Sequence, residues 1–584
     1  MTVETLSEAG RARLLAFLDS AVPKTVRALA ENERSVTFDD DERSAAAALY
    51  EDDVGGPGPE CVHALDPRPS SAAPAAKGSS RDARFWRHLV PTGVSWNRTG
   101  FSLAVSYGRF DVTGWCDSPG ALCVWNLRRR NVDPRTPDHT FETDSCLQCV
   151  AWHPADPAVV AAGSFDGDVH VWDVRGDGDG YGYGYGDGDK DENGDGDGWD
   201  TRRGRAGPGE GFVARSAVSH ASHREPVTAV AWLPSARAAG TRARRASPPA
   251  ARTHDVCSFG SDGRVLVWDF SEAETRGDES VGVESGKRAS GTKVRRVPLP
   301  SFGFEARPPP GAPAARGIGV ARGIGAASFV PSGAHGSGED AAERGRDAAS
   351  IASSSAFLLG CDTGAVMECL LRRGAADKEA FARETAERAA RGEATRAARS
   401  PAAAEYEPHR GAVHGVCAHP SEPGVFLSCG ADGALKIYSR LERRCVVRLE
   451  PRAGALFCAA WSPARPALAA CGTSGGTVVL YDLTEGGSLA GDDGLSGSGQ
   501  KERTGVIERL GGGMASLAPT RELRGCRLGT PTQALAFNPA LPEYLAAADG
   551  TAVRVWDLGA RFAVPAPREG AAIRRLAAGW EARG

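Results

Sequence analysis

The chain has little net charge and no long apolar run. Nucleic-acid binding, membrane insertion and secretion depend on such features. Its 584 residues carry 69 Lys and Arg against 74 Asp and Glu, a formal net charge of −5, whereas nucleic-acid binders show a strong basic excess. No uninterrupted apolar run reaches the roughly 18 residues typical of a membrane-spanning helix. The first ten residues, MTVETLSEAG, contain no apolar core of a secretion signal. We therefore expect a soluble, intracellular protein that binds no nucleic acid and inserts into no membrane.

Motifs for catalysis and metal binding are also missing. The sequence has no H-E-x-x-H pair, and its lone C-x-x-C pair, Cys146 and Cys149, falls in an apolar, strand-like segment. Residues three apart on a strand point to opposite faces, so this pair makes a poor metal clamp. Most of the 14 Cys lie in similar apolar runs, which is typical of small buried side chains. We expect a protein that is not an enzyme and that holds no cofactor or metal.

An acidic, glycine-rich segment, 177–200, contains part of the pattern of a calcium loop. Asp189, Asp191 and Asn193 match the first, third and fifth ligand positions. Asp200 stands where a Glu is expected, and no helical pattern flanks the segment. We favour an acidic linker here, with calcium binding as the alternative.

What the chain does contain is a repeated unit. An apolar strand leads into a second strand of small residues, a tight turn that is Asp-Gly in several copies, and a third strand ending in Trp-Asp or a variant. Period-2 alternation and Asp-Gly turns predict antiparallel β-hairpins. The seven copies lie at about 92–127, 146–174, 223–270, 323–370, 409–439, 453–483 and 530–558. Sheets of this kind stack radially, so the fold class is all-β, a seven-bladed β-propeller.

Polar and aromatic residues recur at fixed places in this unit. An Asp precedes the aromatic residue of the third strand by six positions in the pairs Asp166 and Trp172, Asp262 and Trp268, and Asp432 and Tyr438; His223 and His409 precede the first strand in two copies, and Trp556 ends the last one. This pattern resembles the WD-repeat family, in which such His, Asp and Trp residues form a buried hydrogen-bonded network. The resemblance implies a structural role for these residues.

The last copy supplies only three strands, so the ring needs another strand to close it. The candidates are residues 61–65 (CVHAL) and the tail after 561, and we favour the first. Long tracts lacking a strand pattern lie between and within the copies, at 175–221, 235–253, 271–322, 331–350, 371–408 and 484–528. Their Gly-, Ala-, Arg-, Ser- and Pro-rich composition buries too little apolar surface to offset the entropy of ordering. We expect disordered inserts, with helix propensity only in 371–398.

A short amphipathic pattern precedes the propeller. Leu14, Leu18, Val22 and Val26 follow at helical spacing, which predicts a helix that binds a partner or, alternatively, packs on the propeller. The expected organisation is a helix and linker over 1–59, a propeller over 60–560 and a C-terminal tail over 561–584.

Two segments resemble the WD-repeat dynein intermediate chains, and among them the dynein-2 branch that serves intraflagellar transport. The first is the hairpin SLAVSYGRFDVTGWCDSPGALCVWNL at 102–127, with Tyr107, Arg109, Asp111 and Trp115 as candidate partner-binding residues. The second is the N-terminal helix with the F-D-x element that follows it. Both segments carry features beyond those of the generic repeat.

The resemblance implies a non-catalytic intermediate chain of a ciliary dynein. Such a chain binds the tail of a dynein heavy chain through its propeller, acts beside a second intermediate chain and carries dynein light chains. Because the stretch before the helix is short, a roadblock-type light chain is the one we expect. The implied locations are cytoplasm, cytoskeleton, cilium or flagellum, and basal body. The alternative is a general WD-repeat adaptor, such as a substrate receptor of a ubiquitin ligase.

Overall fold

The computed structural model describes residues 58–68, 85–111, 118–175, 212–216, 219, 221–234, 254–270, 295–297, 300–306, 323–330, 354–372, 375–391, 402–484, 519–523, 529–565 and 569–578. The chain divides into two units, Met1–Gly58 and Pro59–Gly584. Leu14, Leu18, Val22 and Val26 of the predicted helix, Trp115, and the acidic segment 177–200 lie outside the described residues.

The second unit is built from seven β-sheets, numbered here as blades 1 to 7 in chain order. Blade 1 holds β2 (Val90–Trp96), β3 (Ser102–Gly108), β4 (Gly120–Asn126) and β5 (His139–Thr143). Blade 2 holds β6 (Leu147–Trp152), β7 (Val159–Ser164), β8 (Val169–Asp173) and β9 (Phe212–Ser216), with β13 (Arg295–Val297) added in parallel to β9. Blade 3 holds β10 (Val227–Pro234), β11 (His254–Gly260), β12 (Arg264–Trp268) and β14 (Phe302–Glu305).

The other four blades follow the same plan. Blade 4 holds β15 (Ile324–Phe329), β16 (Ser354–Cys361), β17 (Val366–Arg372) and β18 (Ala402–Tyr406). Blade 5 holds β19 (Val413–Ala418), β20 (Val425–Gly430), β21 (Leu435–Ser439) and β22 (Cys445–Leu449). Blade 6 holds β23 (Leu456–Trp461), β24 (Leu468–Thr473), β25 (Val478–Asp482) and β26 (Arg521–Leu523). Blade 7 holds β27 (Ala534–Phe537), β28 (Tyr544–Ala548), β29 (Val553–Asp557) and β1 (Glu60–Leu65).

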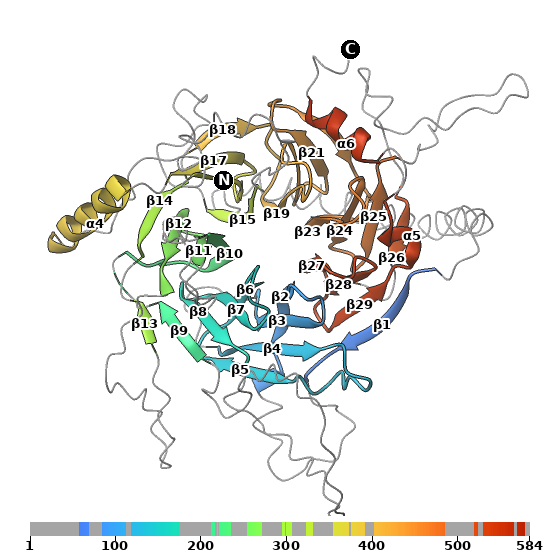
Figure 1. Ribbon diagram of the computed structural model, residues 1–584, viewed down its shortest axis with the longest axis horizontal. Helices are drawn as coiled ribbons and strands as arrows, with labels where there is room; N and C mark the ends of the chain where they lie inside the picture. Colours follow the sequence, from blue (N-terminus) through green and yellow to red (C-terminus); the bar gives the residue numbers. More distant parts are fainter. Residues whose placement is uncertain are drawn as a thin grey trace, which may run out of the picture. The chain divides into compact units, whose positions relative to one another are not determined.

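The seven sheets form a closed ring (Figure 1). The first strand of each repeat contacts the first strand of the next, in the order β2, β6, β10, β15, β19, β23, β27 and back to β2. Each sheet thereby covers its neighbour, which supplies the burial that one isolated sheet lacks. The predicted seven-bladed β-propeller is confirmed.

Residues 61–65 close the ring, as predicted. β1 pairs antiparallel with β29, with Leu65 opposite Val553 and Glu60 opposite Asp557, although the register shifts between Cys61 and His63. Leu65 is fully buried in a core cluster that also includes Val553. One strand from near the start of the chain therefore completes the blade formed at its other end.

The fourth strands of four blades lie inside tracts that we expected to lack strands. β9, β14, β18 and β26 fall within 175–221, 271–322, 371–408 and 484–528, respectively, so the prediction was wrong for those stretches. Outer strands are short, as in the three residues of β26, so their alternation is weak. The helix propensity at 371–398 is confirmed by α4 (Ala375–Ala390).

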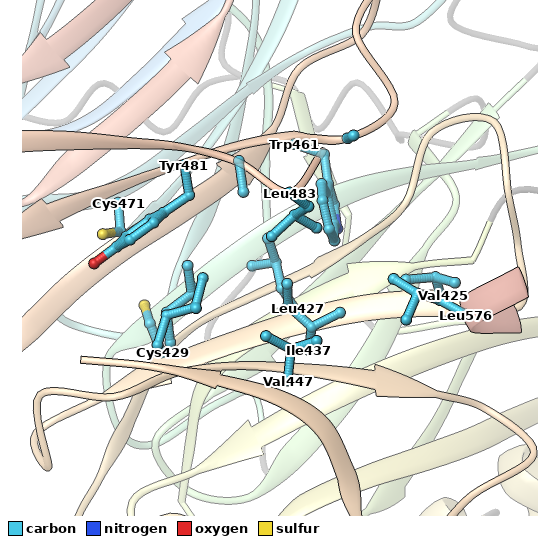
Figure 2. Packing of buried hydrophobic residues seen from close by; sticks show 14 of the residues in the cluster. Val425, Leu427, Cys429, Ile437, Val447, Trp461, Cys471, Tyr481, Leu483 and Leu576 are labelled. Atoms are coloured by element: carbon cyan, nitrogen blue, oxygen red, sulfur yellow. The ribbon is translucent and has the colours of Figure 1, made fainter. Parts of the chain in front are cut away.

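The core lies between neighbouring blades. Between blades 5 and 6, Leu427, Ile437 and Val447 pack against Trp461 and Tyr481 (Figure 2). Burial of each such side chain contributes about 1.5–3 kcal/mol. Two further helices, α5 (Ala560–Ala563) and α6 (Glu569–Ala577), follow β29 and lie on the outer side of the ring (Figure 1).

Candidate interaction sites

Blade 3 contains a complete hydrogen-bonded network of the predicted kind. His223 Nδ1 lies 3.0 Å from Asp262 Oδ1, and His223 Nε2 lies 2.8 Å from Ser258 Oγ. Trp268 Nε1 donates to the same hydroxyl at 2.9 Å. Asp262 sits in the tight turn before Gly263, whose φ of 75° suits glycine. The network ties the turn between β11 and β12 to the segment that enters the blade.

Blade 5 repeats this arrangement with Tyr in place of Trp. His409 Nδ1 lies 2.8 Å from Asp432 Oδ1, and His409 Nε2 lies 2.6 Å from Ser428 Oγ. The hydroxyl of Tyr438 donates instead to the carbonyl of Glu407 at 2.8 Å. Burial alone would raise the pKa of Asp432, but hydrogen bonds from His409 and the Arg410 amide hold it below its ordinary value.

Sequence reasoning missed the serines at the centre of both networks. Ser258 and Ser428 each stand four residues before the network Asp, so a signal was present in the spacing. Blade 2 lacks such a serine, because Ala162 occupies the matching position in its second strand.

The other predicted network residues do not form a His–Asp–Ser network. Asp166 accepts from Ser164 and lies 3.4 Å from Arg215 Nη2 on β9. Trp172 stacks on Phe141 and His170. Trp556 is buried, and its Nε1 has no hydrogen-bond partner in the described part of the chain.

These networks do not offer reactive groups. The side chains of His223 and His409 are fully buried, and both ring nitrogens of each are engaged. Cys146 and Cys149 donate to different carbonyls, those of Ser118 and Val227. Among the residues that the structure describes, no group of three or more His, Cys, Asp or Glu is arranged to hold a metal. None of the described helices is long and apolar enough to cross a membrane.

The hairpin of blade 1 presents part of its predicted partner-binding set. Arg109 Nη2 and Asp111 Oδ2 form an ion pair at 2.9 Å, and the Asp111 side chain is 71% exposed. Between them, Phe110 is 49% exposed, an apolar residue that sequence reasoning did not single out. The expectation that Tyr107 is available to a partner is not met, because Tyr107 is only 2% exposed and packs edge-on against Trp86. Every residue of β3 after Ser102 is buried, and Tyr107 lies in the core cluster of blade 1.

The tail after β29 forms a strap along the outer side of blades 5 to 7, defined here as α5 and α6 and called the C-terminal strap. Phe562 of α5 joins the core between blades 6 and 7, while Ile573 and Leu576 of α6 join the core between blades 5 and 6. Leu576 is seen beside Val425 in Figure 2. Arg465 Nε donates to Glu569 Oε1 at 2.7 Å.

A closed ring of seven blades, with His–Asp–Ser networks in its turns, defines a WD-repeat β-propeller protein. Residues 402–439 match the family model described as "WD domain, G-beta repeat". Residues 119–289 match the model described as "Dynein axonemal intermediate chain 3 WD40 domain". The chain is thus similar to WD-repeat proteins and, over residues 119–289, to a dynein intermediate chain.

Relatives from animals extend this similarity over nearly the whole chain. The chain is 26% identical to cytoplasmic dynein 2 intermediate chain 2 of Mus musculus over 558 residues, which is 95% of this chain and 78% of the relative. It is 26% identical to the Homo sapiens protein of that name over 580 residues, which is 99% of this chain and 82% of the relative. It is 21% identical over 403 residues to the ciliary dynein intermediate chain 2 of Heliocidaris crassispina, covering 68% of this chain and 40% of that relative. The resemblance to WD-repeat dynein intermediate chains, and within them to cytoplasmic dynein 2 intermediate chain 2, is confirmed.

Proposed function

We propose that this chain is the non-catalytic intermediate chain of a dynein-2 motor, which binds the heavy-chain tail through its propeller and supports retrograde intraflagellar transport and cilium assembly. One observation carries the proposal: similarity to cytoplasmic dynein 2 intermediate chain 2 covers 95% of this chain. A shared repeat alone would give similarity confined to the blades, as expected of any WD-repeat protein. The similarity to these relatives supports a role as a dynein intermediate chain. That the chain binds the dynein heavy chain is the further part of the proposal.

The hairpin of blade 1 is the proposed heavy-chain contact. Phe110 is an exposed aromatic side chain, flanked by the ion pair of Arg109 and Asp111. Aromatic and Arg residues are enriched among the side chains that dominate binding energy at interfaces. The backbone of this segment is held in place, because Gln148 Nε2 donates to the Arg109 carbonyl at 3.3 Å. Trp115, which lies between β3 and β4 in the sequence, belongs to the proposed contact.

Further partners and locations follow from the same proposal. A second intermediate chain and roadblock-type light chains complete the assembly, with the predicted helix of Leu14, Leu18, Val22 and Val26 as the proposed light-chain contact. The protein is proposed to reside in the cytoplasm, at the cytoskeleton and basal body, and in the cilium or flagellum.

Purification of the tagged full chain from ciliated cells that lack their own copy tests the proposal. We expect recovery of a dynein-2 heavy chain together with a second intermediate chain and light chains. Recovery of a cullin with no dynein subunit would contradict the proposal and favour a ubiquitin-ligase substrate receptor.

A matched pair of variants tests the hairpin within this experiment. Phe110→Ser should reduce recovery of the heavy chain, whereas Val564→Ser, which alters an apolar residue of 65% exposure just after α5, should not. Equal recovery with both variants, each of them folded, would exclude the hairpin as the contact while leaving the motor role intact.

A further inference from the structure

The outer side of blade 5 carries an exposed apolar residue beside a hollow. Leu441, in the turn between β21 and β22, is 74% exposed, more than any other large hydrophobic side chain of the described chain. It borders a hollow of about 580 Å³ that is also lined by Arg440, Arg574 and Ala577. Arg574 and Ala577 belong to α6, so the hollow lies where the C-terminal strap meets blade 5. Its volume is within the range of binding clefts.

One of the arginines at this site already has a carboxylate partner. Arg440 forms an ion pair with Glu368, which also accepts from the Tyr406 hydroxyl at 2.6 Å. Burial tends to raise the pKa of Glu368, but Arg440 and Tyr406 outweigh burial and lower it, so this carboxylate is ionised and its charge is matched. Glu368 and Arg440 therefore contribute little net charge to the hollow.

Four other arginines lie on the two elements that border the hollow. Arg574 on α6 lines it, and Arg575 on α6 and Arg443 and Arg444 in the turn that holds Leu441 are, like Arg574, exposed. Arg443 lies over the Tyr406 ring, 5.7 Å from its centroid, and helps to lower the pKa of Glu368. The acidic side chains nearby are Glu422, which lines the hollow, and Glu442, which is half-buried in the same turn. The surface is thus basic although the whole chain has a net charge of −5.

The basic side chains on α6 are held in place by the core. Ile573 and Leu576 are each 1% exposed and fix the helix on blades 5 and 6, and Ser439 Oγ donates to the Ala577 carbonyl at 3.1 Å. Gly424 allows this close approach, because a Cβ there would lie 2.9 Å from the Ala577 Cβ. A surface fixed before binding loses less conformational entropy on association.

We infer that this site, the Leu441–Arg574 groove, docks an acidic amphipathic segment of a partner chain. An apolar side chain of that segment packs against Leu441 and Ala577, while its carboxylates face Arg574. Charge complementarity selects an acidic partner, and apolar contact at the centre supplies the desolvated anchor. This inference goes beyond the dynein role, because it identifies the chemistry of the occupant and needs no particular subunit.

Titration of the purified full chain with a labelled helical peptide tests the groove. The probe is an 18-residue peptide with Leu on one face and Glu on the other, followed by fluorescence anisotropy. We expect saturable binding that weakens as salt is raised, because screening shortens the range of the charge interactions. Peptides with Lys in place of Glu, or Ser in place of Leu, should bind at least about tenfold more weakly.

Matched variants locate the binding. Leu441→Ser and Arg574→Glu should each weaken binding of the Glu/Leu peptide about tenfold or more. Val564→Ser and Arg224→Glu, which alter an exposed apolar and an exposed basic residue elsewhere, should leave it unchanged. Circular dichroism checks that every variant is folded. Absence of saturable binding, equal binding of the Lys peptide, or equal binding to a folded Leu441→Ser, Arg574→Glu double variant would each overturn the inference.

Discussion

Arg465, in the turn after β23, and Glu569, the first residue of α6, form an ion pair in which both side chains are buried. Their sequence positions are 104 residues apart. The guanidinium also binds Asp482 at the end of β25, and the exposed fractions of the three side chains are 4% or less. Two carboxylates thus share one buried cation, which fixes the C-terminal strap to blade 6.

Removing that cation should destabilise the protein strongly. Arg465→Met leaves Glu569 and Asp482 buried without a counter-charge, and breaking a buried ion pair in this way costs about 3–5 kcal/mol. Glu569→Gln should cost less, about 1–3 kcal/mol, because Arg465 keeps Asp482 as its partner. Urea unfolding measures both free energies. If Arg465→Met behaved like Glu450→Gln, which alters an exposed ion pair with Arg448, the cluster would have no stabilising role.

Two tryptophans should differ in what their indole nitrogens contribute. Trp268 and Trp556 are both buried. Of the two, only Trp268 Nε1 has a hydrogen-bond partner in the described part of the chain, the Ser258 hydroxyl at 2.9 Å. Trp268→Phe should therefore lower the free energy of unfolding by about 1 kcal/mol more than Trp556→Phe, the value of one net hydrogen bond. Equal losses in urea unfolding would assign both residues to packing alone.

Acid should destabilise the protein partly through His153. This residue is fully buried, and its Nδ1 accepts from the amides of Ala155 and Asp156 at 3.1 and 2.8 Å. Burial, with a contribution from His254, lowers the pKa of His153 to about 4. Between pH 6.5 and 4 the unfolded chain binds a proton that the folded chain does not, so stability falls as pH falls.

Asn offers a matched replacement for His153. In blade 7, Asn538 Oδ1 accepts the amides of Ala540 and Leu541 at 3.0 and 2.9 Å, so His153→Asn should keep the turn and remove the titration. We expect near-native stability at pH 7 and a gain of about 2–3 kcal/mol over the parent at pH 4.5. Urea unfolding across pH measures it. Parallel pH profiles for the two proteins would contradict the assignment.

Closure of the ring should depend on β1. A chain beginning at residue 59 keeps β1 and should fold, whereas one beginning at residue 69 exposes the edge of β29 and should aggregate. In the full chain, Leu65→Ala should cost about 2–5 kcal/mol, because Leu65 is fully buried. Size-exclusion chromatography and urea unfolding measure these outcomes. A monomeric, equally stable chain from residue 69 would show that β1 is dispensable.

The inner strands of each blade were predictable because their signal is local. β20 and β24 are buried along their whole length, which selects apolar and small residues at every position. The turns were equally readable, since Gly167, Gly263 and Gly433 adopt the positive φ that Asp-Gly turns require. The closing strand was also identified, because a ring that ends on three strands lacks one.

The sequence by itself determined the repeat, the blade number and the likeness to dynein intermediate chains, because each repeat encodes its own hairpins. Only the tertiary structure decided which residues of different repeats meet. β9 and β26 are strands because a neighbouring strand offers its edge, and Tyr107 faces the core because β3 is covered by Trp86. Likewise, α6 is held against blade 6 because Glu569, its first residue, accepts a hydrogen bond from the buried Arg465. Such contacts join residues far apart in the chain, and their energy depends on burial that no local pattern specifies.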